Sequence, residues 1–151
     1  MKKFLVLALV AMISATGFSK TLDEVFNAFP KADNVQEVTL DQAMLAMARN
    51  AGAEGANQMK GIDVMGVIAI ENATPEQVKI AKDLMNEGVD GFDVMVDADE
   101  NGEHALILTQ GDEKLISKML IFAVEKDEVA VVLIEGKIDP DNATKMANIV
   151  K

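Results

Sequence analysis

The sequence contains no cysteine, no tryptophan and no tyrosine, and it has a single histidine. Without cysteine the chain cannot form a disulfide, present a thiol nucleophile or bind zinc through thiolates. Without tryptophan and tyrosine it lacks the side chains that most often anchor protein partners or stack on nucleobases. These absences exclude several classes of enzyme and of binding module.

Positive charge is also scarce. The chain has 14 lysines and arginines against 25 aspartates and glutamates, so its formal net charge at pH 7 is −11. A nucleic-acid partner is not expected, because phosphate binding requires a basic surface. Hydrophobic residues make up 50% of the chain, which excludes intrinsic disorder and indicates a single folded domain at residues 20–151.

The N-terminal segment, residues 1–19, has the pattern of a secretory signal peptide. Lys2 and Lys3 precede an apolar run of about ten residues, and small and polar residues follow it. The run is much shorter than the ~20 residues of a membrane-spanning helix, and the lack of cysteine excludes a lipoprotein anchor. Cleavage is expected after Gly17 or Ser19. The sequence thus predicts a periplasmic or secreted protein with no membrane insertion after cleavage.

Four segments carry the apolar spacing of amphipathic helices together with start or stop signals. The clearest begins after Thr74, which is an N-cap with Pro75 in the first turn; Gln77 completes a capping box, and Gly88 ends the helix. The helix after Asp41 is apolar on most sides, so it is expected to be largely buried. The expected helices are 22–29, capped by Thr21; 42–51, capped by Asp41; 75–87; and a final one that opens at Asp139 and Pro140 and places Ala143, Met146, Ala147 and Val150 on one face.

Alternating apolar residues predict strands, and Asn101-Gly102 between two such runs is a strong hairpin signal. The predicted fold is a single α+β domain, in which a mostly antiparallel sheet with a C-terminal four-strand meander is joined by about four helices. The expected strands are 35–40, 61–71 (with Ile62, Val64, Ile68 and Ile70 on one face), 92–99, 103–110, 115–125 and 128–135.

The last two strands are apolar on both faces, so they are expected to lie in the centre of the sheet with both sides covered. If every helix packed on one face, the other face would expose an apolar patch that usually marks an interaction surface. That arrangement predicts a homodimer or a docking site for a cell-envelope partner, whereas helices on both faces predict a monomer. The residues that such a face would expose are Ile116, Leu120, Phe122, Val129, Val131 and Leu133.

The segment from Asp97 to Gly102 matches the first six positions of an EF-hand calcium loop. The twelfth position, which requires a bidentate glutamate, is Leu108, and the flanking segments are predicted strands. A hairpin turn explains the same residues, so an EF-hand is not expected.

Alternate turns of a meander lie at the same end of a sheet, so the first and third turns are expected to form one acidic rim. This rim is a candidate for weak binding of a divalent cation or a small ligand, or for receiving a basic partner. The alternative is a solvated surface that favours solubility and discourages edge pairing. The candidate metal-ligating residues are Asp97, Asp99, Glu103, Glu125, Asp127 and Glu128.

The remaining candidate ligands are His104 and the methionines. A single histidine without a fixed spacing to carboxylates predicts neither a zinc site nor a catalytic triad, so an ordinary strand residue is favoured. Thioethers bind copper(I), but these methionines occupy positions that the periodicity assigns to the core. Those positions are Met44, Met85, Met95, Met119 and Met146. No catalytic residue and no cofactor is assigned.

The C-terminal half resembles a known family. It contains Lys114-Leu-Ile-Ser-Lys-Met-Leu-Ile-Phe, an acidic turn, Val129-Ala-Val-Val-Leu-Ile-Glu-Gly-Lys-Ile-Asp and a closing amphipathic segment. With the short leader and the early helix, the chain resembles the secreted bacterial domain of unknown function 4252 family, most clearly over residues 114–151. The resemblance implies this fold and export, and it implies no activity and no catalytic residues.

The junction Glu135-Gly136-x-Ile138-Asp139 is the hallmark of this resemblance, and it has a structural explanation. Gly136 would let the chain leave a central strand, Ile138 would pack under the final helix and Asp139 would cap that helix.

These observations predict a non-catalytic secreted or periplasmic protein that acts as a protein-interaction module of the cell envelope. The alternative is a weak divalent-cation or small-ligand binding protein that uses the acidic rim. An enzyme is disfavoured because the sequence offers no combination of nucleophile, base and orienting group.

Overall fold

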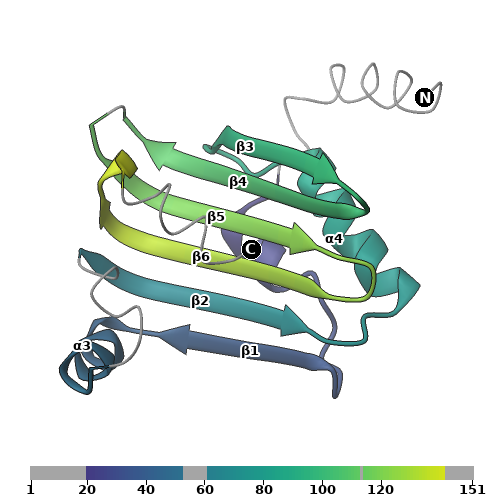
Figure 1. Cartoon of the computed structure of the whole chain (residues 1–151), viewed down its shortest axis with the longest axis horizontal. Helices are drawn as coiled ribbons and strands as arrows, with labels where there is room; N and C mark the ends of the chain where they lie inside the picture. The colour runs from purple at the N-terminus through teal and green to yellow at the C-terminus, as the bar shows by residue number, and fades with distance from the viewer. Residues whose placement is uncertain (1–19, 53–60, 113, 142–151) are drawn as a thin grey trace.

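The computed structural model describes residues 20–52, 61–112 and 114–141, which form a six-stranded antiparallel sheet with helices packed against it (Figure 1). The order across the sheet is β1-β2-β6-β5-β4-β3, so β1 and β3 are the edge strands. This arrangement confirms an α+β fold with a mostly antiparallel sheet. The strands are β1 (Val35–Leu40), β2 (Ile62–Ile70), β3 (Asp93–Glu100), β4 (Glu103–Gly111), β5 (Ile116–Val124) and β6 (Val129–Ile138), and the helices are α2 (Leu22–Phe26), α3 (Gln42–Asn50) and α4 (Pro75–Glu87).

The C-terminal meander is present, because β3, β4, β5 and β6 pair in succession. Its first turn has φ angles of 55° at Asn101 and 83° at Gly102, the left-handed conformations that a type I′ hairpin requires. β6 has a second neighbour outside the meander, since it also pairs with β2. It therefore lies between β2 and β5, as expected for a strand that is apolar on both faces.

The start and stop signals of α4 act as the sequence predicts. The Thr74 hydroxyl accepts a hydrogen bond from the Gln77 N–H at 3.2 Å, and the Gln77 side-chain oxygen accepts one from the Thr74 N–H at 2.9 Å. The helix ends at Gly88, whose φ of 76° suits glycine. Gln77 also exchanges two hydrogen bonds with the side chain of Asn34, at 2.8 and 3.1 Å, which ties α4 to the start of β1.

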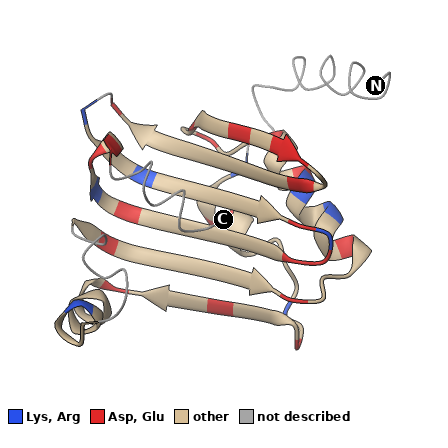
Figure 2. Ribbon diagram, viewed as in Figure 1, with Lys and Arg blue, Asp and Glu red and all other residues tan. Residues whose placement is uncertain are grey.

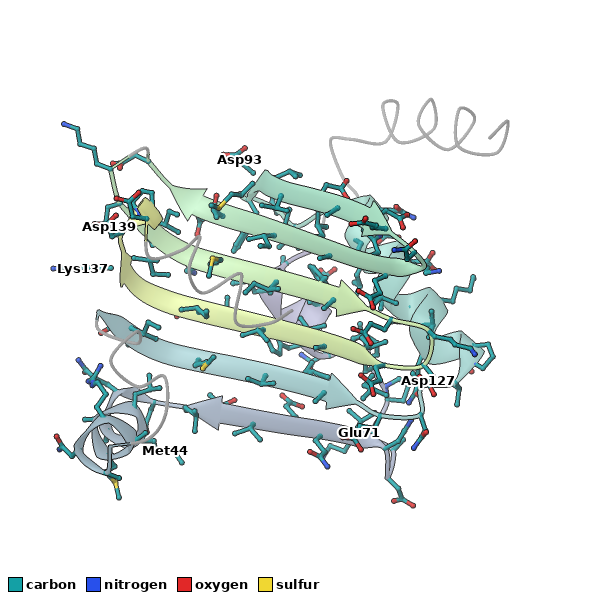
Figure 3. The ribbon with its side chains drawn as sticks, in the orientation of Figure 1. Met44, Glu71, Asp93, Asp127, Lys137 and Asp139 are labelled. Atoms are coloured by element: carbon teal, nitrogen blue, oxygen red, sulfur yellow. The ribbon has the colours of Figure 1, made fainter. Side chains whose placement is uncertain are left out.

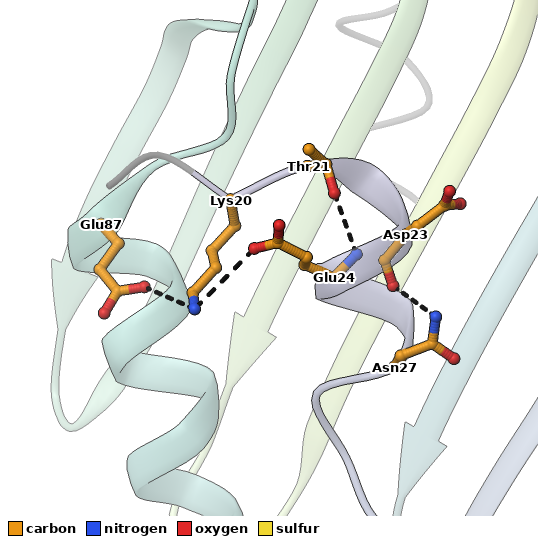
Figure 4. Close-up of polar contacts among 6 residues, drawn as sticks. All are labelled: Lys20, Thr21, Asp23, Glu24, Asn27 and Glu87. Atoms are coloured by element: carbon orange, nitrogen blue, oxygen red, sulfur yellow. Dashed lines mark hydrogen bonds and ion pairs between the residues drawn. The ribbon is translucent and has the colours of Figure 1, made fainter. Parts of the chain in front are cut away.

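Helix α2 begins at its predicted cap but is shorter than the predicted range of 22–29. The Thr21 hydroxyl accepts the Glu24 N–H at 3.3 Å, and the Asn27 side chain donates to the Asp23 carbonyl at 2.8 Å just past the last turn (Figure 4). Lys20 lies 3.9 Å from the carboxylates of both Glu24 and Glu87, so it links α2 to the end of α4.

Each face of the sheet has its own apolar core. Helices α2 and α4 lie on one face, the α4 face, which is behind the sheet in Figure 1. The other face is the α3 face, since Leu45 of α3 packs into its core. The residues that the strands contribute include Leu106, Leu108, Leu120, Phe122, Val131 and Leu133 on the α4 face, and Ile107, Met119, Ile121, Val132 and Ile134 on the α3 face.

The six side chains that an uncovered face would expose are buried, because helices pack on both faces of the sheet, the alternative that the sequence left open. Ile116, Leu120, Phe122, Val129, Val131 and Leu133 are all at most 9% exposed. Five of them lie in the α4-face core, and Ile116 lies in the α3-face core because a bulge before Lys118 reverses the alternation. A second bulge, between Ile62 and Val64, likewise separates Ile62 from Ile68 and Ile70, which the sequence pattern placed together.

Gly136 does not mark the end of a strand, because β6 continues to Ile138. Its φ is 155°, and a Cβ at this position would lie 2.1 Å from the Gly61 carbonyl oxygen, so only glycine lets the two backbones approach. Ile138 is buried in the α3-face core. The Asp139 carboxylate accepts the N–H of Asp141 at 2.9 Å, which agrees with its predicted role as a cap.

Helix α3 is less buried than its composition predicts. Of its nine residues, Leu45 is buried, whereas Met44 is 48% and Met47 is 70% exposed. The core assignment of the methionines therefore holds for Met85 and Met119 and is wrong for Met44 and Met95. Helix α3 lies near the β1 edge, where the sheet offers its apolar side chains little to pack on (Figure 1).

Two expectations concern residues outside the described ranges. They are the signal peptide at 1–19 and the body of the final helix, including Ala143, Met146, Ala147 and Val150.

The core assignment of the α4 face can be tested with matched valine substitutions. Val131→Ala is expected to lower the free energy of unfolding by about 2 kcal/mol, through lost apolar burial and a residual cavity. Val94→Ala, at a position that is 64% exposed on β3, is expected to change it by less than about 0.5 kcal/mol. Urea denaturation measures both, and equal stability of the two variants would contradict the assignment.

Candidate functional site

The strand ends that carry the β3–β4 and β5–β6 turns lie side by side. His104 on β4 pairs with Val124 on β5, so Glu103 and Glu125 occupy the next positions outward on neighbouring strands. Glu100 lies opposite Glu103 in the β3–β4 register. The meander therefore brings carboxylates from two separate turns to one end of the sheet.

Strand β2 adds a carboxylate that the sequence analysis missed. Ile70 pairs with Val129, and continuation of this register places Glu71 opposite Glu128. The available signal was the two-sided apolar character of β6, which requires a neighbour on each side. The resulting glutamate row crosses the ends of five strands, at the end of the sheet where acidic segments gather in Figure 2, and it consists of Glu71, Glu128, Glu125, Glu103 and Glu100, all exposed.

A row of alanines lies two residues inward from the glutamate row on each strand. The strand register pairs Ala69 with Ala130, Ala130 with Ala123, Ala123 with Ala105, and Ala105 with Ala98. The next residues inward, which include Val67, Ile121 and Val132, belong to the α3-face core, so the alanine row is on that face. The alanine row consists of Ala69, Ala130, Ala123, Ala105 and Ala98.

The two rows together enclose a shallow hollow of about 210 Å³ at the ends of β2, β5 and β6. Its depth comes from the short alanine side chains, and its outer border is acidic. The side chains that define it are Glu71, Glu125, Glu128, Ala69, Ala123 and Ala130.

Asp97 and Asp99, two of the six predicted rim residues, point to the opposite face. Asp97 lies opposite Leu106, a residue of the α4-face core, and its Oδ1 is 2.6 Å from Nε2 of His104. Asp99 lies opposite His104 and so shares that face. The histidine is thus held by a strand carboxylate, in a diagonal cross-strand pair.

Asp127 lies at the tip of the β5–β6 turn, at the same end of the sheet as Glu71 (Figure 3). Its backbone carbonyl accepts a hydrogen bond from the Ala73 N–H at 2.7 Å. This bond ties the turn to the loop that precedes α4, so the acidic end has a fixed position relative to that helix.

The charges of the glutamate row are not paired within the described part of the chain. Lys126 is the one cation in the two turns, and no ion pair among the described residues includes a member of the row. In the same ranges, no three histidine, aspartate or glutamate side chains come together as a metal site requires. The row is a line of separate charges at strand spacing, roughly 4.8 Å from one strand to the next.

Residues 26–146 match the domain of unknown function family DUF4252, and the chain belongs to this family. Neither the curated proteins nor the solved structures include a match to the chain. Within the described ranges, no helix has the length and apolar character needed to cross a membrane.

The line of separate charges predicts no specific calcium effect. Millimolar CaCl₂ is expected to raise the melting temperature no more than NaCl of equal ionic strength, because Ca²⁺ requires six to eight converging oxygen ligands. Differential scanning fluorimetry in both salts measures this. A calcium-specific rise that disappears in Glu125→Gln/Glu128→Gln would contradict the prediction and establish the rim as a cation site.

Proposed function

We propose that this chain is an exported, non-catalytic binding protein of the cell envelope, and that its glutamate row receives a basic segment of a protein partner. The observation that carries the proposal is the in-register alignment of five unpaired glutamates across five strand ends. A row of this kind attracts and orients a partner with a matching row of lysines or arginines.

The spacing of the row suits a peptide or helix better than a single ion. Lysines or arginines at positions i and i+3 or i+4 of a helix lie about 5–6 Å apart, close to the spacing of neighbouring strands. A single cation would contact at most two of these side chains. The geometry therefore favours a basic partner over the alternative of a divalent-cation site.

The alanine row supports the same interpretation. Small side chains allow the backbone of a partner to approach the sheet closely, so its long basic side chains can reach outward to the glutamates. The hollow at Ala69, Ala123 and Ala130 gives this contact an apolar floor beside its charged border. Such a combination of an apolar floor and a charged border is usual in specific interfaces.

The same charges disfavour a second copy of this chain as the occupant. Two glutamate rows that faced each other would repel, since Lys126 is the one cation that the two turns provide. The six apolar residues that a dimer interface through an uncovered face would use are buried in the two cores. We therefore propose a different protein as the partner.

Export is supported by the leader alone. Lys2, Lys3 and the short apolar run that follows have the features of a cleaved signal peptide. Intact-mass measurement of native material is expected to give an N-terminus at Phe18 or Lys20, in the soluble periplasmic or secreted fraction. A protein that retains residues 1–17, or that sediments with membranes, would contradict this part of the proposal.

The glutamate row is tested by charge-neutral variants. In Glu103→Gln/Glu125→Gln/Glu128→Gln, the affinity for the partner is expected to fall at least tenfold, about 1.4 kcal/mol of binding free energy, so less partner is recovered from a native periplasmic extract. The partner, identified by mass spectrometry, is then titrated against both purified proteins, and its affinity for the unmodified chain is expected to fall with salt.

The matched control is Glu24→Gln/Asp83→Asn/Glu87→Gln, which removes the same charge from α2 and α4. This control is expected to bind like the unmodified protein. If both triple variants lose the same affinity for the partner, binding depends on net charge alone. If the first variant loses none, the glutamate row is not the binding surface.

A further inference from the structure

A second hollow, of about 480 Å³, opens on the α4 face beside α2. We call it the α2 pocket. Four neighbouring strands supply its floor and far wall, and α2 supplies the near wall. It shares no residue with the glutamate row, which lies at the other end of the sheet.

The floor of the α2 pocket is apolar, and a glycine shapes it. Gly66 lies between Thr39 on β1 and Leu133 on β6 in the sheet register. A Cβ at Gly66 would lie 3.4 Å from two ring atoms of Phe26, so the ring rests directly on the β2 backbone. Because α2 ends at Phe26, the strands beyond this ring stay uncovered by the helix.

The walls of the pocket carry more negative than positive charge. Lys118 and Glu135 are direct partners across β5 and β6, and their charged atoms are 3.9 Å apart. Asp23 of α2 and Glu37 of β1 are further lining residues, and no ion pair of the described chain includes either of them. Two carboxylates from different elements are thus left without a counter-charge above an apolar floor.

We propose that the α2 pocket binds a small aliphatic diamine. Two ammonium groups would match Asp23 and Glu37, the connecting methylenes would lie on Leu133, and the face of Phe26 would add a cation–π contact. An anion is disfavoured by the two uncompensated carboxylates. A metal ion is disfavoured as well, because no three ligands converge in the described residues.

Titration calorimetry with 1,4-diaminobutane tests the proposal, with 1,4-butanediol as the uncharged analogue. The diamine is expected to bind with a dissociation constant of about 1 mM or below, and the diol is expected not to bind. Heats for the diamine that do not exceed those of NaCl at equal ionic strength would overturn the proposal.

Three variants distinguish diamine binding in the α2 pocket from general attraction of a cation to an acidic protein. Asp23→Asn/Glu37→Gln is expected to weaken diamine binding at least tenfold, since both side chains are exposed and their replacement leaves the core intact. Glu103→Gln/Glu125→Gln, which removes the same charge from the glutamate row, is expected to leave it unchanged. Lys118→Gln is expected to strengthen binding severalfold, because it removes the one cation among the described residues that line the pocket.

An equal loss in the first two variants, or a Lys118→Gln protein that does not bind more tightly, would overturn the assignment. The outcome is independent of the proposed protein partner, because the unaffected control here carries two of the three substitutions that are expected to weaken binding of that partner.

Discussion

The burial of β6 on both faces and along both edges is the constraint on which the rest of the structure depends. Its alternate side chains, such as Val131 and Val132, enter two different cores, so each face of the sheet must be covered at its centre. A strand with two apolar faces cannot lie at an edge, and the meander gives β6 one neighbour, β5. β2 must therefore return to its other side. That return places Glu71 beside Glu128 and places Gly66 beside Leu133.

Local signals predicted the fold well where a few neighbouring residues determine the conformation. Three such signals depend on contacts within four positions of the chain, and all three act as predicted. They are the capping box of Thr74 and Gln77, the end of the helix at Gly88 and the turn at Asn101-Gly102. The bulges before Lys118 and before Val64 depend on a partner strand instead. The alternation of apolar and polar residues within one strand does not reveal an extra residue. The sequence pattern therefore places Ile116 on the wrong face.

The candidate site was predictable in its position and not in its composition. Meander geometry predicted that the two acidic turns meet, because hairpins fix the direction of successive strands. The face on which each acidic side chain lies depends on the strand register, which places Asp97 beside His104 on the face opposite the glutamate row. Glu71 required a pairing between segments far apart in the sequence. The exposure of Met44 shows that composition alone also overestimates burial, since a helix near a sheet edge makes fewer contacts than its apolar composition suggests.

The two edge strands differ in a way that bears on assembly into larger sheets. Within the described residues, β3 and β1 each have one strand neighbour. β3 carries Asp93, Asp97, Asp99 and Glu100, whereas β1 carries Glu37 as its one acidic residue, with Val38 half exposed beside it. Charged side chains on an edge oppose the addition of a foreign strand. Polymerisation by strand addition is therefore opposed at the β3 edge. Growth of the sheet would have to start at the β1 edge.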